Sequence, residues 1–137
     1  MRLVAFALNL PWTLLGFCEA LISVPYGLSF DRPHKGIVIK VKSLWWLDIL
    51  YYPNKPRGVA QGHVVLLHGS RARPGDLEHE LIHVVQYDRH PLIHPFLYMI
   101  ELFRVGYWRN RFEVEAYTRS DTWPRDRKPR SNLNILK

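Results

Sequence analysis

Apolar residues are concentrated in two stretches of the chain, residues 3–30 and residues 96–108. The first contains one charged side chain, Glu19, and is long enough to span a bilayer. Asn9 and Pro11 interrupt it, so it also fits a pair of core helices broken near Pro11. The second is apolar on nearly all sides of a helix, as in helices that are buried or face lipid. We therefore predict that residues 1–30 form an apolar N-terminal segment and that the protein associates with membrane lipid, with a cytoplasmic location as the alternative.

Between these two stretches, the pattern predicts strands. Residues 36–42 are rich in β-branched side chains, and residues 62–69 form an apolar run bounded by glycines. Residues 44–52 are strongly aromatic and fit either a strand or a segment at a membrane–water boundary. Residues 53–58 are expected to form a turn-rich basic loop.

A helix is predicted over residues 76–87, directly after the helix-breaking pair Pro74-Gly75. Asp76 is expected at its N-cap, and Glu78 suits the positive end of the helix dipole. Apolar side chains recur along it at helical spacing, namely Leu77, Leu81, Val84 and Val85.

Two histidines four residues apart, His79 and His83, give this helix its candidate chemistry. At that spacing, both imidazoles leave one face of the helix and can bind one zinc ion. Glu80 follows the first histidine, where its carboxylate can reach a water on the metal rather than the metal itself. The pattern His-Glu-x-x-His is typical of zincins. A surface helix that carries two histidines and a solvated glutamate is the alternative.

Composition limits the rest of the molecule. At 137 residues with 47% hydrophobic content, the chain can bury one core, so one domain is expected. The net charge of +7 permits nucleic acid or an anionic membrane as a partner and does not choose between them. The one cysteine, Cys18, excludes an intramolecular disulfide and a cysteine-rich zinc site.

The third metal ligand is expected in the helical stretch of residues 112–117, Phe-Glu-Val-Glu-Ala-Tyr. Two histidines and one glutamate, with an open position for water or substrate, are a known catalytic zinc set. The two motifs together resemble those of gluzincins, especially the membrane zinc metallopeptidases that process prenylated proteins and their bacterial heat-shock relatives. The second motif of those enzymes is Glu-x-x-Ala-Asp, with the glutamate as third ligand. The resemblance therefore implies Glu113 as the ligand, with Glu115 as the alternative.

The resemblance extends from the metal helix to Ala116 and ends at a departure, because Tyr117 stands where those enzymes have aspartate. Metal sites usually hold a ligand histidine through a hydrogen bond to a neighbouring group, and Asp88 and Asp121 are the substitutes in this chain. Tyr87 and Tyr117 could each donate a hydrogen bond to a tetrahedral oxyanion.

The expected fold is α+β, with a small antiparallel or mixed sheet packed on the helices that carry the two motifs. In zincin-like enzymes, an extended peptide pairs with a sheet edge beside the metal helix. We therefore expect the strand at residues 64–68 to be that edge, with Val64, Val65 and Leu66 binding substrate; a core strand without that role is the alternative. The metal-binding domain is predicted over residues 31–120, and residues 121–137 are predicted to form a basic flexible tail.

The residues together predict a zinc-dependent metallopeptidase that hydrolyses a peptide or protein substrate. His79, His83 and Glu113 would hold Zn²⁺, and Glu80 would act as general base and then general acid. A membrane-associated zinc-binding domain without turnover is the first alternative, because Tyr117 replaces the expected aspartate. A basic nucleic-acid-binding module is the second. The aromatic residues lie in apolar runs and are not interleaved with the basic ones, which argues against nucleic acid as a partner.

Overall fold

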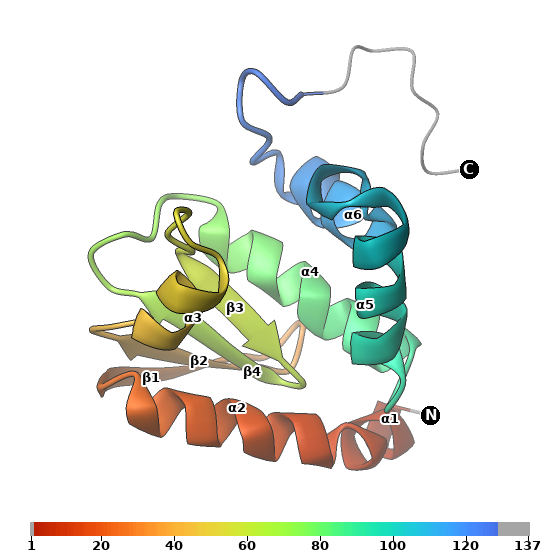
Figure 1. Cartoon of the computed structure of the whole chain (residues 1–137). Helices are drawn as coiled ribbons and strands as arrows, with labels where there is room; N and C mark the ends of the chain where they lie inside the picture. Colours follow the sequence, from red (N-terminus) through yellow and green to blue (C-terminus); the bar gives the residue numbers. More distant parts are fainter. Residues whose placement is uncertain (1, 129–137) are drawn as a thin grey trace.

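The fold is built on a four-stranded sheet with helices on both of its faces (Figure 1). A computed structural model describes residues 2–128. In chain order, the elements of this part are α1 (Arg2–Leu8), α2 (Leu10–Ile22), β1 (Pro25–Asp31), β2 (Gly36–Val41), α3 (Trp45–Leu50), β3 (Gly58–Gln61), β4 (Val64–His68), α4 (Asp76–Arg89), α5 (His94–Val105), the 3-10 helix η1 (Tyr107–Arg109) and α6 (Arg111–Ser120).

The sheet is mixed, with strand order β1-β2-β4-β3. β2 and β4 run parallel, whereas β1 pairs with β2 and β3 pairs with β4 in antiparallel fashion. β4 lies inside the sheet, and all five of its side chains are buried. An unbroken apolar run is what a strand covered on both faces requires. The prediction of an α+β fold with a small mixed sheet is confirmed.

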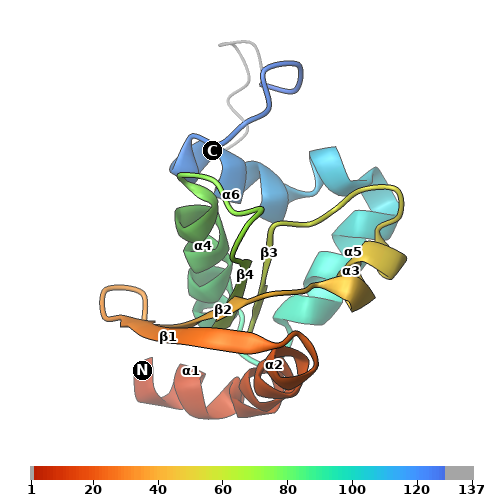
Figure 2. The same cartoon turned by 90° about the vertical axis from the view of Figure 1, so that its left-hand side faces the viewer.

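Helices lie on both sides of the sheet (Figure 2), and apolar side chains fill the space between the helices and each face. α2 and α3 cover one face, where the buried side chains are Ala20, Ile39, Val41, Leu44, Leu47, Val64 and Leu66. α4 covers the other face, where the buried side chains are Val38, Val65, Leu67, Leu81 and Val84. The alternation of β2 and β4 therefore divides their side chains between two cores.

The N-terminal apolar stretch folds as two short helices and the first strand. Its helices are separated at Asn9, whose side chain donates to the carbonyl of Tyr87 at 2.9 Å and accepts from the N–H of Leu92 at 3.0 Å. α2 approaches the sheet closely at Gly16, where an added Cβ would lie 2.7 Å from Cβ of Val64. β1 then pairs along β2. Residues 2–31 therefore share one sheet and one core with the strands β2 and β4.

Two further observations concern the segments that the sequence linked to membranes. Along residues 2–128, no helix combines the length and the apolar character needed to cross a bilayer. The aromatic stretch at residues 44–52 contains the short helix α3, so of the two interpretations offered for it the strand is wrong. The physical reason is that Leu44 and Leu47, one helical turn apart, both pack into the core under the sheet.

α5 and α6 complete the molecule, and α6 packs along α4 (Figure 1). After α6, residues 121–128 stay in contact with the domain. The ring of Trp123 lies 5.0 Å from that of Tyr117, and the guanidinium of Arg127 lies 5.2 Å from the ring of Trp108. The remainder of the predicted flexible tail, residues 129–137, lies outside the described residues.

Candidate metal centre

The helix α4 begins at a left-handed glycine and a buried aspartate. Gly75 occupies the N-cap with φ 91°, so the prediction of Asp76 as N-cap is wrong by one residue. The carboxylate of Asp76 accepts a hydrogen bond from the N–H of Arg73 at 2.7 Å and pairs with the guanidinium of Arg57 at 2.8 Å. These contacts fix the first turn of the helix against the loop that precedes β3.

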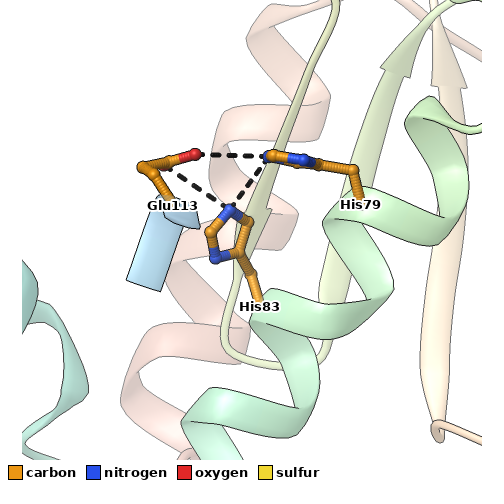
Figure 3. Close-up of side chains that lie close together, drawn as sticks. All are labelled: His79, His83 and Glu113. Carbon is orange, nitrogen blue, oxygen red and sulfur yellow. Dashed lines mark hydrogen bonds and ion pairs between the residues drawn. The ribbon is translucent and has the colours of Figure 1, made fainter. Parts of the chain in front are cut away.

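Three buried side chains from two helices meet in one cluster, His79 and His83 of α4 and Glu113 of α6 (Figure 3). The two Nε2 atoms lie 3.3 Å apart. Nε2 of His79 lies 3.3 Å from Oε2 of Glu113, and Nε2 of His83 lies 3.5 Å from Oε1. The structure thus brings together the three residues that the sequence proposed as metal ligands.

The two glutamates of α6 have different surroundings. Asn110 caps this helix by accepting a hydrogen bond from the N–H of Phe112 at 3.0 Å, which places Glu113 in the first turn, facing α4. Glu115, the alternative ligand, instead pairs with Arg89 at 2.9 Å and with Arg119 at 3.2 Å. Although burial opposes ionisation, these partners lower the pKa of Glu115 to about 2. Glu115 therefore stabilises the packing of α6 and lies outside the cluster.

The separations within the cluster fit a tetrahedral metal ion. Ligand atoms about 2.0–2.1 Å from such an ion lie about 3.3–3.5 Å from one another, because a tetrahedron edge is about 1.6 times the centre-to-corner distance. The two Nε2 atoms are 3.3 Å apart, and Nε2 of His79 is 3.3 Å from Oε2 of Glu113, which matches that edge; Nε2 of His83 lies 3.5 Å from the other carboxylate oxygen, Oε1. Oε2 of Glu113 is also buried without a hydrogen-bond partner among residues 2–128. Two imidazoles and one carboxylate can therefore hold a metal ion and leave a fourth position open.

Gln86, which the sequence analysis did not single out, orients one of the histidines. Its Oε1 lies 2.8 Å from Nδ1 of His83, and its amide nitrogen donates to Glu115 and to the carbonyl of Phe112, each at 2.9 Å. Because the amide oxygen is an acceptor, Nδ1 of His83 carries the proton, and Nε2 keeps its lone pair for a metal. The signal was present in the sequence, since residues three apart on a helix are neighbours.

His79 is held differently. Its ring packs against that of Tyr117, with the centroids 4.4 Å apart, and its Nδ1 is buried with no hydrogen-bond partner in the described part of the chain. Neither of the two predicted substitutes for the missing aspartate reaches a ligand histidine. Asp88 pairs with His63 at 2.8 Å, and Asp121 pairs with Lys128 at 3.3 Å.

Within the cluster, each charged group stabilises the ionised form of the oppositely charged group beside it. Burial disfavours a charged imidazole, but Glu113 and Glu80 outweigh it and raise the pKa of His83 to about 9. Burial likewise opposes ionisation of Glu113, yet the two histidines hold its pKa well below the usual range. The carboxylate is therefore ionised and faces positive charge, which a metal ion would supply in place of the proton on His83.

Glu80 lines the same pocket as His79, His83 and Glu113, a space of about 990 Å³. Burial raises the pKa of Glu80, and the neighbouring charge of Glu113 adds to this, while His79 and His83 act in the opposite direction. A carboxylate with a raised pKa in a pocket is suited to taking up and returning a proton. It lies on the same helix as both histidines, as the motif predicted.

Tyrosines supply all of the side-chain hydroxyl groups among the residues that line this pocket, namely Tyr51, Tyr87, Tyr98, Tyr107 and Tyr117. The hydroxyl of Tyr87 donates to Oε1 of Gln61 at 2.8 Å, and that of Tyr117 lies 3.0 Å from the hydroxyl of Tyr107. Both hydroxyls that the sequence suggested for binding an oxyanion therefore have protein partners.

The sequence did not identify Tyr51 as a residue of this pocket. Tyr51 follows α3 in the chain and comes near the cluster only through the fold. Burial raises its pKa, and the charges of Glu113 and Glu80 add to this.

The sheet edge at the pocket is β3 and not β4. The prediction that residues 64–68 form the edge is wrong, because β4 is paired on both sides, and the side chains expected to bind substrate there, Val64, Val65 and Leu66, are fully buried. β3 forms the end of the sheet, and its residues Gly58–Gln61 line the pocket.

Among residues 2–128, backbone groups at the free edge of β3 have no hydrogen-bond partner. The N–H of His68 donates to the carbonyl of Arg57 at 2.9 Å, so these two residues are a hydrogen-bonded pair of the antiparallel ladder. Such pairs alternate along the ladder, which places the bonds to β4 at Val59 and Gln61. The N–H and C=O groups of Gly58 and Ala60 therefore point away from β4, toward the free edge.

Comparisons of the chain with protein-family models, with curated proteins and with solved structures give no match.

Proposed function

We propose that this protein is a zinc-dependent metallopeptidase, of the gluzincin kind that its two motifs resemble. The observation that carries the proposal is the meeting of His79, His83 and Glu113 with ligand atoms 3.3–3.5 Å apart. Two imidazoles and one carboxylate are ligands that zinc prefers in catalytic sites. Glu80, a carboxylate that is not part of this set, lies in the same pocket.

Each residue then has a defined part in peptide hydrolysis. A zinc ion in this site would supply Lewis acidity toward the scissile carbonyl and lower the pKa of water. Glu80 takes a proton from the attacking water and passes it to the leaving amine, a use that suits its raised pKa. Gln86 keeps the Nε2 atom of His83 directed at the metal position.

The substrate in this proposal is an extended peptide or protein segment. Gly58 and Ala60 offer unused backbone groups at the edge of β3, beside the ligands. A peptide that adds to this edge would be held by its own backbone, largely independently of its sequence. Val64, Val65 and Leu66 have no part in this proposal.

The substitution Glu80→Gln tests the activity and separates it from zinc binding. Glutamine has nearly the same size but cannot accept the proton, so hydrolysis of an unfolded protein or a peptide library should fall by about 10² to 10⁴. Zinc content should remain at about one per chain. Glu78→Gln, on the exposed side of the same helix, is the matched control and should retain full activity.

Two outcomes would contradict the proposal. If the Glu80→Gln protein cleaves as fast as the unchanged protein while zinc is intact, Glu80 is not the base. If zinc binds at the predicted stoichiometry and no peptide is cleaved, the protein is a zinc-binding domain without turnover, which the departure at Tyr117 first suggested.

We also propose that the protein acts at a membrane. Large apolar side chains are exposed on α1, α2, α3 and α5, among them Leu3, Leu21, Leu50 and Phe103. Exposed apolar surface of this extent is typical of proteins that contact lipid or another protein. Recovery of the native protein entirely in the supernatant of lysed cells at low salt, without detergent, would contradict this location.

A further inference from the structure

The outer side of α2 is apolar and solvent-exposed. Only small side chains of this helix, Thr13, Gly16 and Ala20, face the core, so its large side chains point away from the sheet. Leu14 and Leu21 are 60% and 75% exposed. A surface helix of a globular domain normally carries charged and polar residues on its outer face. α2 has one charged residue, and its outer surface therefore requires an apolar partner.

α5 and α3 extend this surface. Phe96, Ile100 and Phe103 recur at helical spacing on α5 and are all more than half exposed, so they form one stripe along that helix. On α3, Ile49 and Leu50 are 68% and 72% exposed. Neither set contributes to the two buried cores.

Two tryptophans connect these apolar faces at the ends of α2. At its N-terminal end, the ring of Trp12 lies 5.8 Å from that of Phe96 on α5. At its C-terminal end, the indole N–H of Trp45 on α3 donates to the carbonyl of Ile22 at 3.0 Å. We call the exposed apolar side chains of α2, α3 and α5 the apolar arc. In Figure 1, α2 runs along the lower side of the molecule, with α5 at its N-terminal end.

The pocket that contains His79, His83 and Glu113 lies between the α3 part and the α5 part of the apolar arc. Leu47 of α3 and Pro95, Met99 and Leu102 of α5 all line this pocket. Met99 is itself 43% exposed, so the lining of the pocket passes into the arc without a polar boundary on that side.

Basic residues border the apolar arc. Lys42 and Lys55 flank α3, and both are exposed. Asp48 of α3 pairs with Arg71 at 2.7 Å and Glu101 of α5 pairs with Arg104 at 2.6 Å, so these two carboxylates are neutralised within the fold. The remaining acidic residue of these helices, Glu19 of α2, is partly buried. The chain as a whole carries a net charge of +7. An apolar surface with a cationic border is complementary to a bilayer with anionic headgroups.

We propose that the apolar arc docks on the surface of a bilayer that contains anionic phospholipid, with α2 lying along that surface and the metal pocket next to it. Trp12 and Trp45 suit this position, because amphipathic indoles favour the headgroup level. A second copy of the chain fits less well, since a two-fold contact places each patch, basic border included, against its own copy. The docking does not depend on the metal chemistry. It rests on the membrane location proposed above and identifies the surface that would contact the membrane.

The first test is flotation of the purified full chain with phospholipid vesicles. We expect binding to vesicles of phosphatidylcholine with added phosphatidylglycerol and weaker binding to phosphatidylcholine alone. High salt should reduce the binding and not abolish it, because the apolar contribution is unaffected by screening. Absence of binding to both kinds of vesicle would overturn the proposal, and equal binding to both would overturn the role of the basic border.

The second test changes the arc itself. The triple variant Phe96→Gln, Ile100→Gln, Phe103→Gln removes an exposed stripe, so the fold should persist while vesicle binding falls at least about tenfold. Leu77→Gln, an exposed apolar residue on α4 outside the arc, is the matched control and should bind as before. Zinc content measured on the same samples distinguishes loss of docking from loss of the metal centre. Unchanged binding by the triple variant would overturn the proposal, as would a dimer in solution that this variant dissociates.

Discussion

Tyr98 donates a hydrogen bond of 2.6 Å to Oε1 of Glu113, the carboxylate whose other oxygen lies 3.3 Å from Nε2 of His79. Tyr98 belongs to α5, so this contact connects a third helix to the candidate metal centre. The phenol therefore fixes the orientation of the Glu113 carboxylate beside the two histidines. Burial raises the pKa of Tyr98, so its hydroxyl remains a donor at any ordinary pH.

Tyr98→Phe should therefore weaken metal binding without unfolding the protein. The ring keeps its packing, but Glu113 loses the partner that fixes its orientation, and loss of such a partner typically costs about 10- to 100-fold in metal affinity. Titration of the zinc-loaded protein with a competing chelator measures the effect. Tyr52→Phe, at a position that is 84% exposed, should leave the affinity unchanged. Equal affinities for the Tyr98→Phe and unchanged proteins would show that Glu113 needs no support from α5.

Elemental analysis should find about one zinc per chain, and His83→Ala should abolish it. The reason is geometric, because two remaining ligands no longer define the tetrahedral position. His34→Ala serves as the control and should retain the ion, since His34 pairs with Asp31 in the turn between β1 and β2, where it has a structural contact of 2.7 Å. Stoichiometric zinc in the double variant His79→Ala, His83→Ala would place the ion elsewhere in the molecule.

The parts of the centre that local chain geometry dictates could be predicted from the sequence. His79 and His83 had to share one helix face once their segment was recognised as helical, because residues four apart lie one above the other. Glu113 followed from the second motif, and the structure brings all three into one cluster. The strand at residues 64–68 was also recognisable, from its apolar run between glycines.

The parts that depend on contacts between distant segments could not be predicted in the same way. Tyr98 reaches Glu113 only because α5 packs beside α6, and nothing in the local sequence predicts that contact. β3 is only four residues long, Gly58–Gln61, and has little apolar pattern, so its position at the sheet edge could not be predicted from the sequence. By contrast, the interior position of β4 could have been deduced from the sequence, since an unbroken run of apolar residues favours a strand that is covered on both faces.

The stability of the protein should depend on the ionisation of Glu19. Burial raises its pKa from 4.5 to about 7, and its Oε2 has no hydrogen-bond partner in the described chain. The folded state therefore holds a proton that the unfolded chain releases near pH 4.5, so the free energy of unfolding falls as pH rises from about 4.5 through 7. Since the side chain is partly exposed, we expect this loss to be about 1–2 kcal/mol.

Glu19→Gln should remove that loss, because glutamine mimics the protonated acid at every pH. Urea unfolding in the presence of a chelator should show equal stability of the two proteins near pH 4 and a more stable variant at pH 8, by about 1–2 kcal/mol. Glu78→Gln, at an exposed position, should follow the unchanged protein at both pH values. A variant that is no more stable at pH 8 would mean that water already solvates the Glu19 carboxylate.

Proline substitutions in β3 test whether its free edge binds the substrate. The N–H of Ala60 points away from β4, so Ala60→Pro removes a group that the sheet does not use. The folded protein should survive this change and keep its zinc, but peptide hydrolysis should lose efficiency mainly through a higher KM, because a substrate backbone loses its donor. Val59→Pro is the matched comparison, since that N–H lies in the ladder with β4, and its removal should destabilise the fold. If Ala60→Pro leaves both kcat and KM unchanged, the substrate does not pair with β3.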